Sequence, residues 1–517
     1  MSSHEEDAIK PDIVIIGSGV GGGSVAYQLA ATGARILILE RGDFLPKEVQ
    51  NREAEAVFIQ NRYRTTEEWC REDGSHFRPG QYYYVGGHTK FYGTAMFRFR
   101  ESDFEETHFD DGISPAWPIS YSDLEPYYAQ AEALFGVRGE AGVDPTEPPR
   151  SGNYPHPAIP HEPVIARMVA GLARQGLRPF HMPSAIDYGD GGACERCGTC
   201  DAFPCMIDAK GDAETSLLKR ILDRPNVTLW TNAKVQRLIT DGEGKAIKGV
   251  EIEHNGKKQV IEAPLFVLSA GAINSALILL RSASEKNPHG VANRSGVVGR
   301  HLMNHHLTGL IGILPFSENR TNFPKTVSVN DFYYGLPGDS GARGNIQMLG
   351  KIQGAMIRSI HRNFPVSFAD MFGHHTVDWL MMSEDLPKSD SQVRLTREGE
   401  VEIAYHPGGW PGHDRFVKAM RHKLRKLGFP VILRHSFGIE APSHQCGTVR
   451  MGQDPKRSVL NAFCQAHDHP NLYVVDGGFF PSSAALNPAL TIAAQALRVG
   501  DHLKELWQKD RLAAKVV

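Results

Sequence analysis

Three short stretches of this 517-residue sequence carry groups that can do chemistry. Gly17, Gly19 and Gly22 form a G-x-G-x-x-G turn near the start of the chain. Residues 194–205 hold four cysteines in the segment CERCGTCDAFPC. Residues 444–452, HQCGTVRMG, hold a histidine in a stretch with too little hydrophobic pattern for a core strand. These stretches point to nucleotide binding, to thiol or metal chemistry, and to proton transfer.

The glycine turn is typical of a dinucleotide site. Gly17 permits a tight turn, Gly19 lets the backbone approach a pyrophosphate at a helix N-terminus, and Gly22 allows close helix–strand packing. Glu40 follows the next strand, where a carboxylate accepts hydrogen bonds from ribose and favours an unphosphorylated adenosine over NADP. We expect FAD rather than NAD, because a flavin needs the extra enclosure that later segments of the chain can supply. The non-functional alternative is a glycine-rich turn that binds no nucleotide, beside a solvated Glu40.

The cysteine segment leaves three interpretations open. Its thiols, Cys194, Cys197, Cys200 and Cys205, could bind an iron–sulfur cluster or zinc, or could be free thiols in a loop that closes over the cofactor. The last cysteine precedes Met206 rather than the proline of ferredoxin-type runs, which favours the free-thiol loop. Seven cysteines is an odd number and argues against a disulfide framework. The other three we expect to be buried packing residues: Cys70, Cys446 and Cys464.

The elements around the glycine turn predict an α/β fold with a Rossmann-like domain. Residues 12–16 and 35–40 are short apolar strands on either side of a helix, which implies a parallel sheet. Further strands and a helix are predicted in 226–241 and 256–282. The pattern returns to a strand and a long helix after residue 471, so the first and last segments are expected to share one sheet. The late loop 444–452 would then be carried back to the nucleotide site.

The middle of the chain has a different pattern. Residues 310–440 are rich in aromatic, Met, Gly and His residues and contain alternating strands such as QVRLTREGEVEIAY, which predict a mainly antiparallel substrate domain. We therefore divide the chain into an FAD-binding domain of discontinuous segments and a substrate-binding domain. The predicted boundaries are 1–110, 191–310 and 441–517 for the first, and 111–190 and 311–440 for the second.

Composition excludes several classes of protein. The net charge is −3 with no basic stripe, so no nucleic-acid partner is expected. The start, MSSHEEDAIKPD, is polar and unlike a secretory signal, and no apolar run approaches the ~18 residues of a membrane span. We expect a cytoplasmic protein with no membrane span, and an oligomer is possible.

Several motifs together resemble the glucose–methanol–choline (GMC) oxidoreductases over nearly the whole length. They are DIVIIGSGVGGGSVAYQLA with LERG, VGGHTKFYGTAMFRFRESDF (85–104), WPISYSDLEPYY (117–128), LSAGAINSALILLRS, GVVGRHLMNHH (296–306), and HQCGTVRMG with VVDGGFFPSSAALNPALTIAAQALR. Within the family the chain is most similar to the bacterial pyranose oxidases and glycoside 3-oxidases. The resemblance implies bound FAD and oxidation of an alcohol by hydride transfer to the flavin.

The resemblance also implies a catalytic pair. His444 matches the family histidine that lies against the flavin, and Asn487 of Leu-Asn-Pro matches its partner. A neutral imidazole is a suitable base near pH 7, and an amide can orient the same hydroxyl without competing for its proton. Asn487 and Pro488 precede a helix, so backbone N–H groups there could face the flavin. The non-catalytic alternatives are that His444 is an ordinary loop histidine and that Asn487 is an ordinary residue at a helix N-terminus.

Further cofactor contacts follow from the same motifs. The glycines of VGGHTKFYG should let this segment wrap the flavin. Phe91 occupies the position at which some pyranose oxidases carry a flavin-linked histidine, and His88 lies elsewhere in the loop, so we predict non-covalent FAD. The predicted cofactor-binding residues are Gly17, Gly19, Gly22, Glu40, Arg41, Gly86, Gly87, Thr89, Val235, Ala270, Gly271, Asp476, Gly477, Asn487 and Pro488. No metal ligands are predicted beyond the cysteine alternatives.

The histidines of HLMNHH (301–306) we interpret as structural, and His374 and His375 as groups that could hydrogen-bond a polyol. The expected reaction is oxidation of a sugar or glycoside hydroxyl to a ketone, with His444 as base and oxygen or a quinone as electron acceptor. The alternatives are a dehydrogenase subunit with a cluster at Cys194–Cys205, a sterol-type alcohol oxidase, and a non-catalytic FAD-binding protein. The polar and aromatic residues of 310–440 favour a sugar over a sterol.

Overall fold

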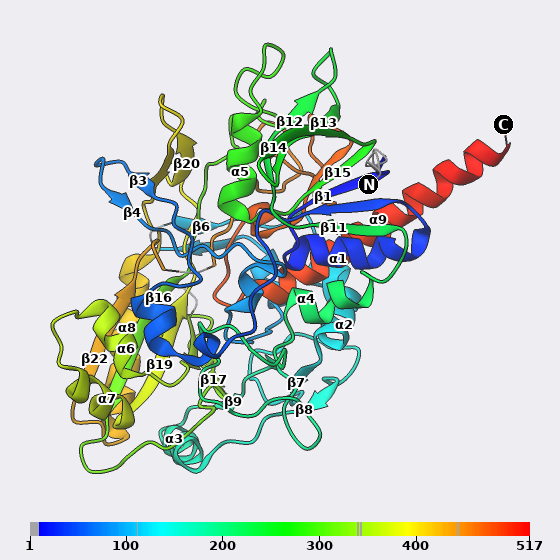
Figure 1. Cartoon of the computed structure of the whole chain (residues 1–517). Coiled ribbons are helices and arrows are strands. Elements are labelled where there is room, and N and C mark those ends of the chain that lie inside the picture. Colours follow the sequence, from blue (N-terminus) through cyan, green and yellow to red (C-terminus); the bar gives the residue numbers. More distant parts are fainter. Residues whose placement is uncertain (1–9, 111, 339–340, 342–343, 442–443, 517) are drawn as a thin grey trace, which may run out of the picture.

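A computed structural model describes residues 10–110, 112–338, 341, 344–441 and 444–516 (Figure 1). Its centre is a five-stranded sheet in which all neighbouring strands run parallel. The strand order is β11 (Val227–Trp230), β2 (Ile36–Leu39), β1 (Ile13–Ile16), β15 (Leu265–Leu268) and β23 (Leu472–Val474). This confirms the expected α/β fold, in which the first and last segments of the chain share one sheet.

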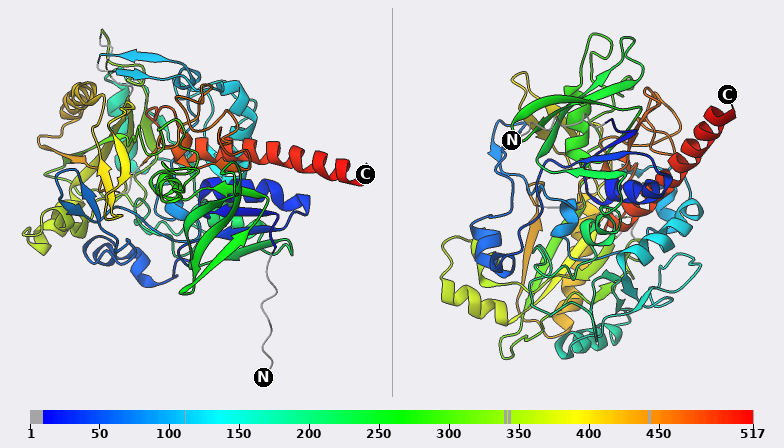
Figure 2. Two further views of the ribbon diagram at one scale, coloured as in Figure 1. Left: turned by 90° about the horizontal axis from the view of Figure 1, so that it is seen from above. Right: turned by 45° about the vertical axis from the view of Figure 1, so that its right-hand side comes forward.

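Helices from both ends of the chain cover this sheet. Helix α1 (Val20–Leu29) begins directly after the glycine turn and packs against α9 (Ala489–Val516), which also contacts α2 (Tyr121–Phe135). Helix α5 (Ala272–Arg281) follows β15. The C-terminal part of α9 extends away from the rest of the molecule in Figures 1 and 2. The end of the chain therefore completes the layer that its beginning starts.

The second layer is a six-stranded antiparallel sheet. Its order is β22 (Ile432–Phe437), β16 (His306–Ile313), β19 (Thr376–Ser383), β18 (Gly344–Met348), β17 (Val327–Val329) and β9 (Phe180–His181). Successive side chains of a strand point to opposite faces. One face, which includes Trp379 and Met381, packs on α8 (Trp410–Lys426) and α3 (Pro163–Ala173). The other face carries Asn345 and Gln347 toward residues 444–487.

Smaller sheets and helices complete the described chain. One antiparallel sheet joins β12 (Ala233–Thr240), β13 (Ile247–His254) and β14 (Lys257–Glu262), and another joins β20 (Gln392–Leu395), β21 (Val401–Ala404), β3 (Trp69–Arg71) and β4 (His76–Phe77), with β21 and β3 parallel. The shortest sheets are β10 (Ser184–Ala185), β7 (Val137–Gly139) and β8 (His156–Pro157), and β5 (Thr107–Phe109) with β6 (Gly112–Ser114). The remaining α-helices are α4 (Ala213–Ser216), α6 (Gly354–Ile360) and α7 (Val366–His374).

Two sequence expectations concern these parts. The hairpin predicted in QVRLTREGEVEIAY is present as β20 and β21. His374 is the last residue of α7, and His375 Nδ1 lies 3.1 Å from the carbonyl oxygens of Leu314 and Ser317, while a role of either residue in binding a polyol stays a prediction. Within the described ranges, no helix combines the length and apolar character needed to cross a membrane. The division into two domains stays a prediction.

Candidate active site

The glycine turn is built so closely that side chains would not fit. Gly17 has φ +101°, and a Cβ there would lie 2.2 Å from the carbonyl oxygen of Ser269. A Cβ at Gly22 would lie 2.1 Å from the carbonyl oxygen of Gly17. The N-cap of α1 is Gly19, and Ser269 Oγ accepts from the Gly22 N–H at 2.8 Å, whereas the N–H groups of Val20 and Gly21 bond no described group and remain for an anion. These features fit a pyrophosphate cradle.

The carboxylate of Glu40 stands at the end of β2 beside this turn. Its Oε2 accepts hydrogen bonds from the backbone N–H and the hydroxyl of Ser18 at 3.1 and 2.6 Å, and its Oε1 accepts one from the Gly42 N–H at 3.0 Å. Since a carboxylate has about four acceptor positions, Glu40 keeps capacity for a ribose hydroxyl. Ser18 Oγ also accepts from the Gly86 N–H at 3.2 Å, which ties the loop after residue 85 to the glycine turn.

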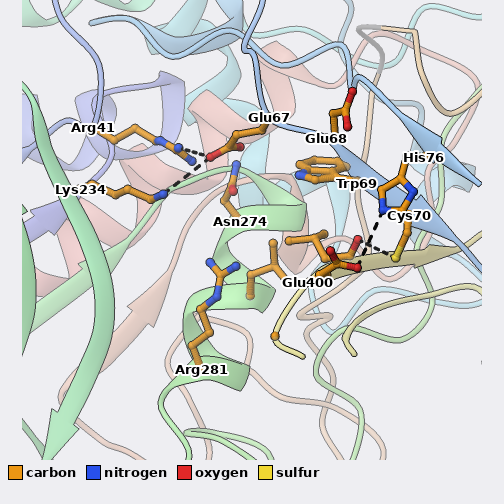
Figure 3. Close-up of a pocket in the computed structure, with 13 residues that line it drawn as sticks. Arg41, Glu67, Glu68, Trp69, Cys70, His76, Lys234, Asn274, Arg281 and Glu400 are labelled. Atoms are coloured by element: carbon orange, nitrogen blue, oxygen red, sulfur yellow. Dashed lines mark hydrogen bonds and ion pairs between the residues drawn. The ribbon is translucent and has the colours of Figure 1, made fainter. Parts of the chain in front are cut away.

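A cavity of about 250 Å³ is lined by Arg41, the residue that follows Glu40 (Figure 3). Arg41 donates to Glu67 at 2.5 Å and its guanidinium lies 3.6 Å from the ring centre of Tyr83. Lys234 Nζ approaches the same carboxylate at 3.7 Å, next to Val235, which is buried. Asn274 and Arg281 line the cavity from α5. Arg41 thus lines this cavity and Val235 follows Lys234, another of its lining residues, while the cofactor contacts of Arg41 and Val235 stay a prediction.

The ends of β15 and β23 are joined by Asp476. Its Oδ2 accepts from the Gly271 N–H at 3.0 Å and from the Ser275 hydroxyl at 2.5 Å, and its Oδ1 accepts from the Gly478 N–H at 2.8 Å. Burial raises the pKa of this carboxyl. Asp476 therefore positions the turn that contains the predicted residues Ala270 and Gly271, which begins α5, and its neighbour Gly477 begins a 3-10 turn.

The loop predicted to wrap the flavin also contacts the glycine turn. Gly86 and Gly87 have φ values of +92° and +61°, and a Cβ at Gly87 would lie 3.1 Å from Gly19 Cα. The Thr89 hydroxyl donates to the Gly86 carbonyl at 2.7 Å and closes the loop. Phe91 is buried and stacked on Tyr82 with ring centres 3.9 Å apart. His88 Nε2 instead hydrogen-bonds the Gln81 side chain at 2.9 Å.

The loop that carries His444 is held by backbone hydrogen bonds to an earlier segment. Cys446 and Met303 exchange two of them, at 2.9 and 3.0 Å. Gly447 has φ +89°, and a Cβ there would lie 2.3 Å from the carbonyl oxygen of His301. This close approach places His444 opposite His305, the residue that directly precedes β16.

The hydrogen bonds around His305 assign the hydrogen positions on His444. His305 Nε2 lies 2.9 Å from the carbonyl oxygen of Ser483, which can only accept, so this nitrogen carries the hydrogen. The neutral ring then has its lone pair on Nδ1, which lies 2.9 Å from His444 Nδ1. His444 Nδ1 must therefore donate, and His444 Nε2 keeps its lone pair. That nitrogen is the one that lies 3.5 Å from Asn487 Nδ2.

Asn487 is oriented by side chains of the antiparallel sheet. Gln347 Nε2 donates to Asn487 Oδ1 at 2.5 Å and to Asn345 Oδ1 at 2.7 Å. Because the Asn487 oxygen is engaged in this way, its NH₂ group faces His444 Nε2. Gln347 is fully buried, whereas His444 and Asn487 are half-buried. A donor and an acceptor thus converge at the exposed end of a buried amide chain, just before Pro488 and α9.

Electrostatics keep the imidazoles neutral. Burial, then His305, Lys325 and His88, lowers the pKa of His444 well below its usual 6.5. Burial lowers the pKa values of His305 and His88 to about 4. A histidine that is neutral at physiological pH, with a free lone pair on Nε2, can accept a proton from a hydroxyl group.

The four cysteines of residues 194–205 line one small cavity of about 30 Å³, and none of them forms a disulfide. Burial raises the pKa of Cys194, and raises that of Cys200 to about 12, so these thiols keep their protons. In the described part of the chain, no set of three or more His, Cys, Asp or Glu side chains is arranged to hold a metal ion. Cys70, Cys446 and Cys464 are buried, as expected.

The structure adds residues that the sequence interpretation missed. His305 was assigned a structural role within HLMNHH, but it hydrogen-bonds the predicted base. Asn345 and Gln347 were not singled out. The sequence feature that could have identified them is the pair of amide residues at alternate positions of GNIQM. All residues of this strand are buried. Buried polar side chains need partners, so such a pair on a buried strand indicates a polar site.

Comparisons with known proteins identify the family of this chain. Family models described as GMC oxidoreductase match residues 79–307 and 433–496. The chain is 32% identical to the 6‴-hydroxyparomomycin C oxidase of Streptomyces lividus, over 97% of this chain and 93% of that protein. It is 31% identical to the paromamine 6′-oxidase of Streptomyces fradiae, over 94% and 90% of the two chains. The crystal structure of pyridoxine 4-oxidase from Mesorbium loti matches with a TM-score of 0.66 and 18% identity, covering 95% of this chain and 99% of that one, which shows a shared fold. The protein belongs to the GMC oxidoreductase family and is an oxidoreductase that acts on CH–OH groups.

Proposed function

We propose that this enzyme oxidises a hydroxyl group of a sugar or glycoside to a carbonyl group, with non-covalent FAD as cofactor and His444 as base. One observation carries the proposal: the hydrogen-bond chain from Ser483 through His305 leaves His444 Nε2 with a free lone pair beside the amide of Asn487. An acceptor and a donor at one point are what a substrate hydroxyl needs, because it must donate its proton and be held by its oxygen.

In this arrangement the substrate oxygen accepts a hydrogen bond from Asn487 Nδ2 and donates one to His444 Nε2. His444 takes the hydroxyl proton as the carbinol C–H bond breaks. His305 remains hydrogen-bonded to His444 Nδ1 and stabilises the ring in the orientation that the reaction requires. Gln347 prevents the Asn487 amide from turning its oxygen toward the base. Each of these residues positions a proton or its acceptor before the reaction starts.

The chain offers a continuous set of groups to hold FAD. The glycine turn would hold the pyrophosphate, Glu40 the ribose, and the cavity beside Arg41 and Lys234 the adenine. When bound, FAD supplies the two-electron acceptor that takes hydride from the carbinol carbon. Phe91, at the position where some family members carry a flavin-linked histidine, cannot form such a bond, which supports non-covalent binding.

The substrate class is supported by the relatives and by the sheet face opposite the base. The two similar Streptomyces enzymes are named as oxidases of hydroxyparomomycin C and of paromamine, which supports a sugar or glycoside for this chain. The face that holds Gln347 also carries Leu349, Leu380 and Phe437, which form one apolar cluster. Amides beside an apolar surface suit a ring that has hydroxyls at its edge and C–H groups on its face.

We propose oxygen as the electron acceptor and a quinone as the second candidate. The dehydrogenase alternative, with a cluster at Cys194–Cys205, ranks lower because the described side chains form no metal-binding group there and burial keeps Cys200 protonated. A sterol substrate ranks lower because of the buried amides at the site.

The test is to purify the protein, record its visible absorbance, precipitate it with acid, and measure flavin, iron and zinc in both fractions. The native protein is then mixed without oxygen with a panel of pyranoses, glycosides and amino sugars, and with a sterol as the contrasting substrate. We expect FAD in the supernatant and bleaching of its absorbance by a sugar derivative. Flavin that stays with the pellet would contradict non-covalent binding. Bleaching by the sterol alone would contradict the proposed substrate class.

A further inference from the structure

A buried ion pair lies next to the candidate active site and has no part in the reaction described above. Lys325, which lies just before β17, has 5% of its surface exposed, and its Nζ lies 2.8 Å from Asp201 Oδ2. The same carboxylate oxygen accepts from the Gly350 N–H at 3.1 Å. Asp201 belongs to the cysteine loop, so this loop brings an anion toward the site.

The ion pair lies directly against the loop predicted to wrap the flavin. A Cβ at Gly93 would lie 2.2 Å from Lys325 Nζ and 2.3 Å from Asp201 Oδ1. Only glycine leaves room over its Cα for both the ammonium of Lys325 and the carboxylate of Asp201. Gly93 therefore allows the ammonium to lie directly against this loop. Gly93 ends the segment VGGHTKFYG, whose first glycines contact the pyrophosphate turn. Lys325 therefore lies at the end of the loop that is remote from the phosphates.

Lys325 is also the charged group that lowers the pKa of His444, the proposed base. Three side chains lower the pKa of His444 after burial itself: His305, Lys325 and His88. With pKa values of about 4, His305 and His88 are neutral at pH 7. An ammonium has three N–H donors, and in the described part of the chain Asp201 is the one acceptor that hydrogen-bonds Lys325. Its other N–H groups are available to a bound molecule.

We propose that Lys325 is the cation that promotes reoxidation of the reduced cofactor by dioxygen, an inference that rests on the proposed oxygen-dependent function. In the complete reaction the C–H and O–H bonds of the alcohol break, and the carbonyl compound forms. Two electrons and two protons pass to O₂, which becomes H₂O₂.

The physical reason is the change of charge on oxygen. Dioxygen is neutral and gains negative charge as soon as it accepts electrons, before the protons arrive. A fixed cation in a water-poor site stabilises such developing charge without reorganisation. His444 becomes a cation only after it has taken the hydroxyl proton, and its environment disfavours that protonated form. Lys325, paired with Asp201 and packed over Gly93, supplies a positive charge that does not depend on this proton transfer.

The experiment measures reoxidation without any organic substrate. The FAD-containing enzyme is reduced with dithionite and mixed in a stopped-flow instrument with oxygenated buffer or with ferricenium, a cationic acceptor that becomes neutral on reduction. Wild type is compared with Lys325→Met, Lys325→Arg, and the double variant Lys325→Met/Asp201→Asn, which removes both charges and leaves no unpaired carboxylate. Lys351→Met is the matched control, because Lys351 is a half-buried lysine that donates to the Asn319 carbonyl at 2.6 Å.

We expect reoxidation by oxygen to slow by about tenfold to hundredfold in Lys325→Met and in the double variant. Lys325→Arg, Lys351→Met and the ferricenium reaction should stay within about twofold of wild type. A second readout needs no turnover: sulfite adds reversibly to oxidised flavins as an anion, and its Kd should rise about tenfold without the cation. Equal oxygen rates in wild type and Lys325→Met, or an equal slowing with ferricenium, would overturn the role of Lys325. Because dithionite replaces the sugar, such a result leaves the proposed oxidation of sugars to its own test.

Discussion

The two ends of the candidate cofactor site are built in different ways. At the nucleotide end, Gly17, Gly19 and Gly22 form the turn with backbone atoms, and a few side chains stand beside it, among them Ser18, Glu40 and Ser269. At the reaction end, the backbone serves only to position side chains. The site there is formed by the hydrogen bonds among four of them: His305, His444, Asn487 and Gln347. The comparison teaches that one end depends on the absence of side chains and the other on their orientation.

Adding a side chain to the glycine turn at the nucleotide end should have the largest effect on the protein, through its flavin content. In Gly17→Ala the new Cβ would lie 2.2 Å from the Ser269 carbonyl oxygen at a φ of +101°, so the turn must distort. We expect the purified variant to retain almost no flavin, measured as the ratio of flavin to protein absorbance. Gly74→Ala is the control, because Gly74 also has a positive φ, +78°, but no atom within 4 Å of its Cβ position. Full flavin content in Gly17→Ala would contradict the cradle.

Removing the base should leave the nucleotide end intact. His444→Ala is expected to keep FAD and to lower kcat/KM about 10³-fold, the usual contribution of a general base. The measurement combines flavin content with steady-state kinetics on the substrate found in the panel. His444→Gln, which keeps a polar side chain but cannot accept the proton as a base of similar pKa, should be nearly as slow. An unchanged kcat/KM would exclude His444 as the base.

A smaller effect is expected from Gln347→Leu, which frees the Asn487 amide to rotate. We expect kcat/KM to fall by about tenfold to hundredfold, because loss of orientation alone commonly costs this much. Met348→Leu is the matched control, because Met348 is adjacent in the strand but packs into the core on the opposite face. Equal kinetics for the two variants would show that the amide chain does not position Asn487.

The smallest effect concerns pH. Because the pKa of His444 is lowered, the base is neutral above the usual histidine pKa of 6.5, so kcat/KM should be flat there and fall only at lower pH. The ammonium of Lys325 contributes to this lowering, so Lys325→Met should move the acidic limb of the profile to higher pH. The profile of kcat/KM against pH for both proteins tests this. A limb that stays in place, or moves to lower pH, would contradict the electrostatic contribution of Lys325.

This contrast also explains what could be predicted from the sequence. The parallel sheet and the glycine turn follow from local patterns, because IVII, ILIL and G-x-G-x-x-G lie within one strand–helix–strand unit. His444 and Asn487 were identified through family motifs. His305 and Gln347 were not, because their roles depend on contacts between residues 139 and 140 positions apart in the chain. Local patterns carry no information about such pairings.

The position of β23 and α9 has a consequence for biosynthesis. The central sheet needs Leu472–Val474 beside β15, and α1 packs against α9, so the nucleotide layer cannot close until nearly the whole chain has left the ribosome. Contacts between the first and last segments close a very long loop, which slows their formation. The glycine turn, although synthesised first, becomes a complete binding site last, and cofactor capture is a late event in the maturation of this enzyme.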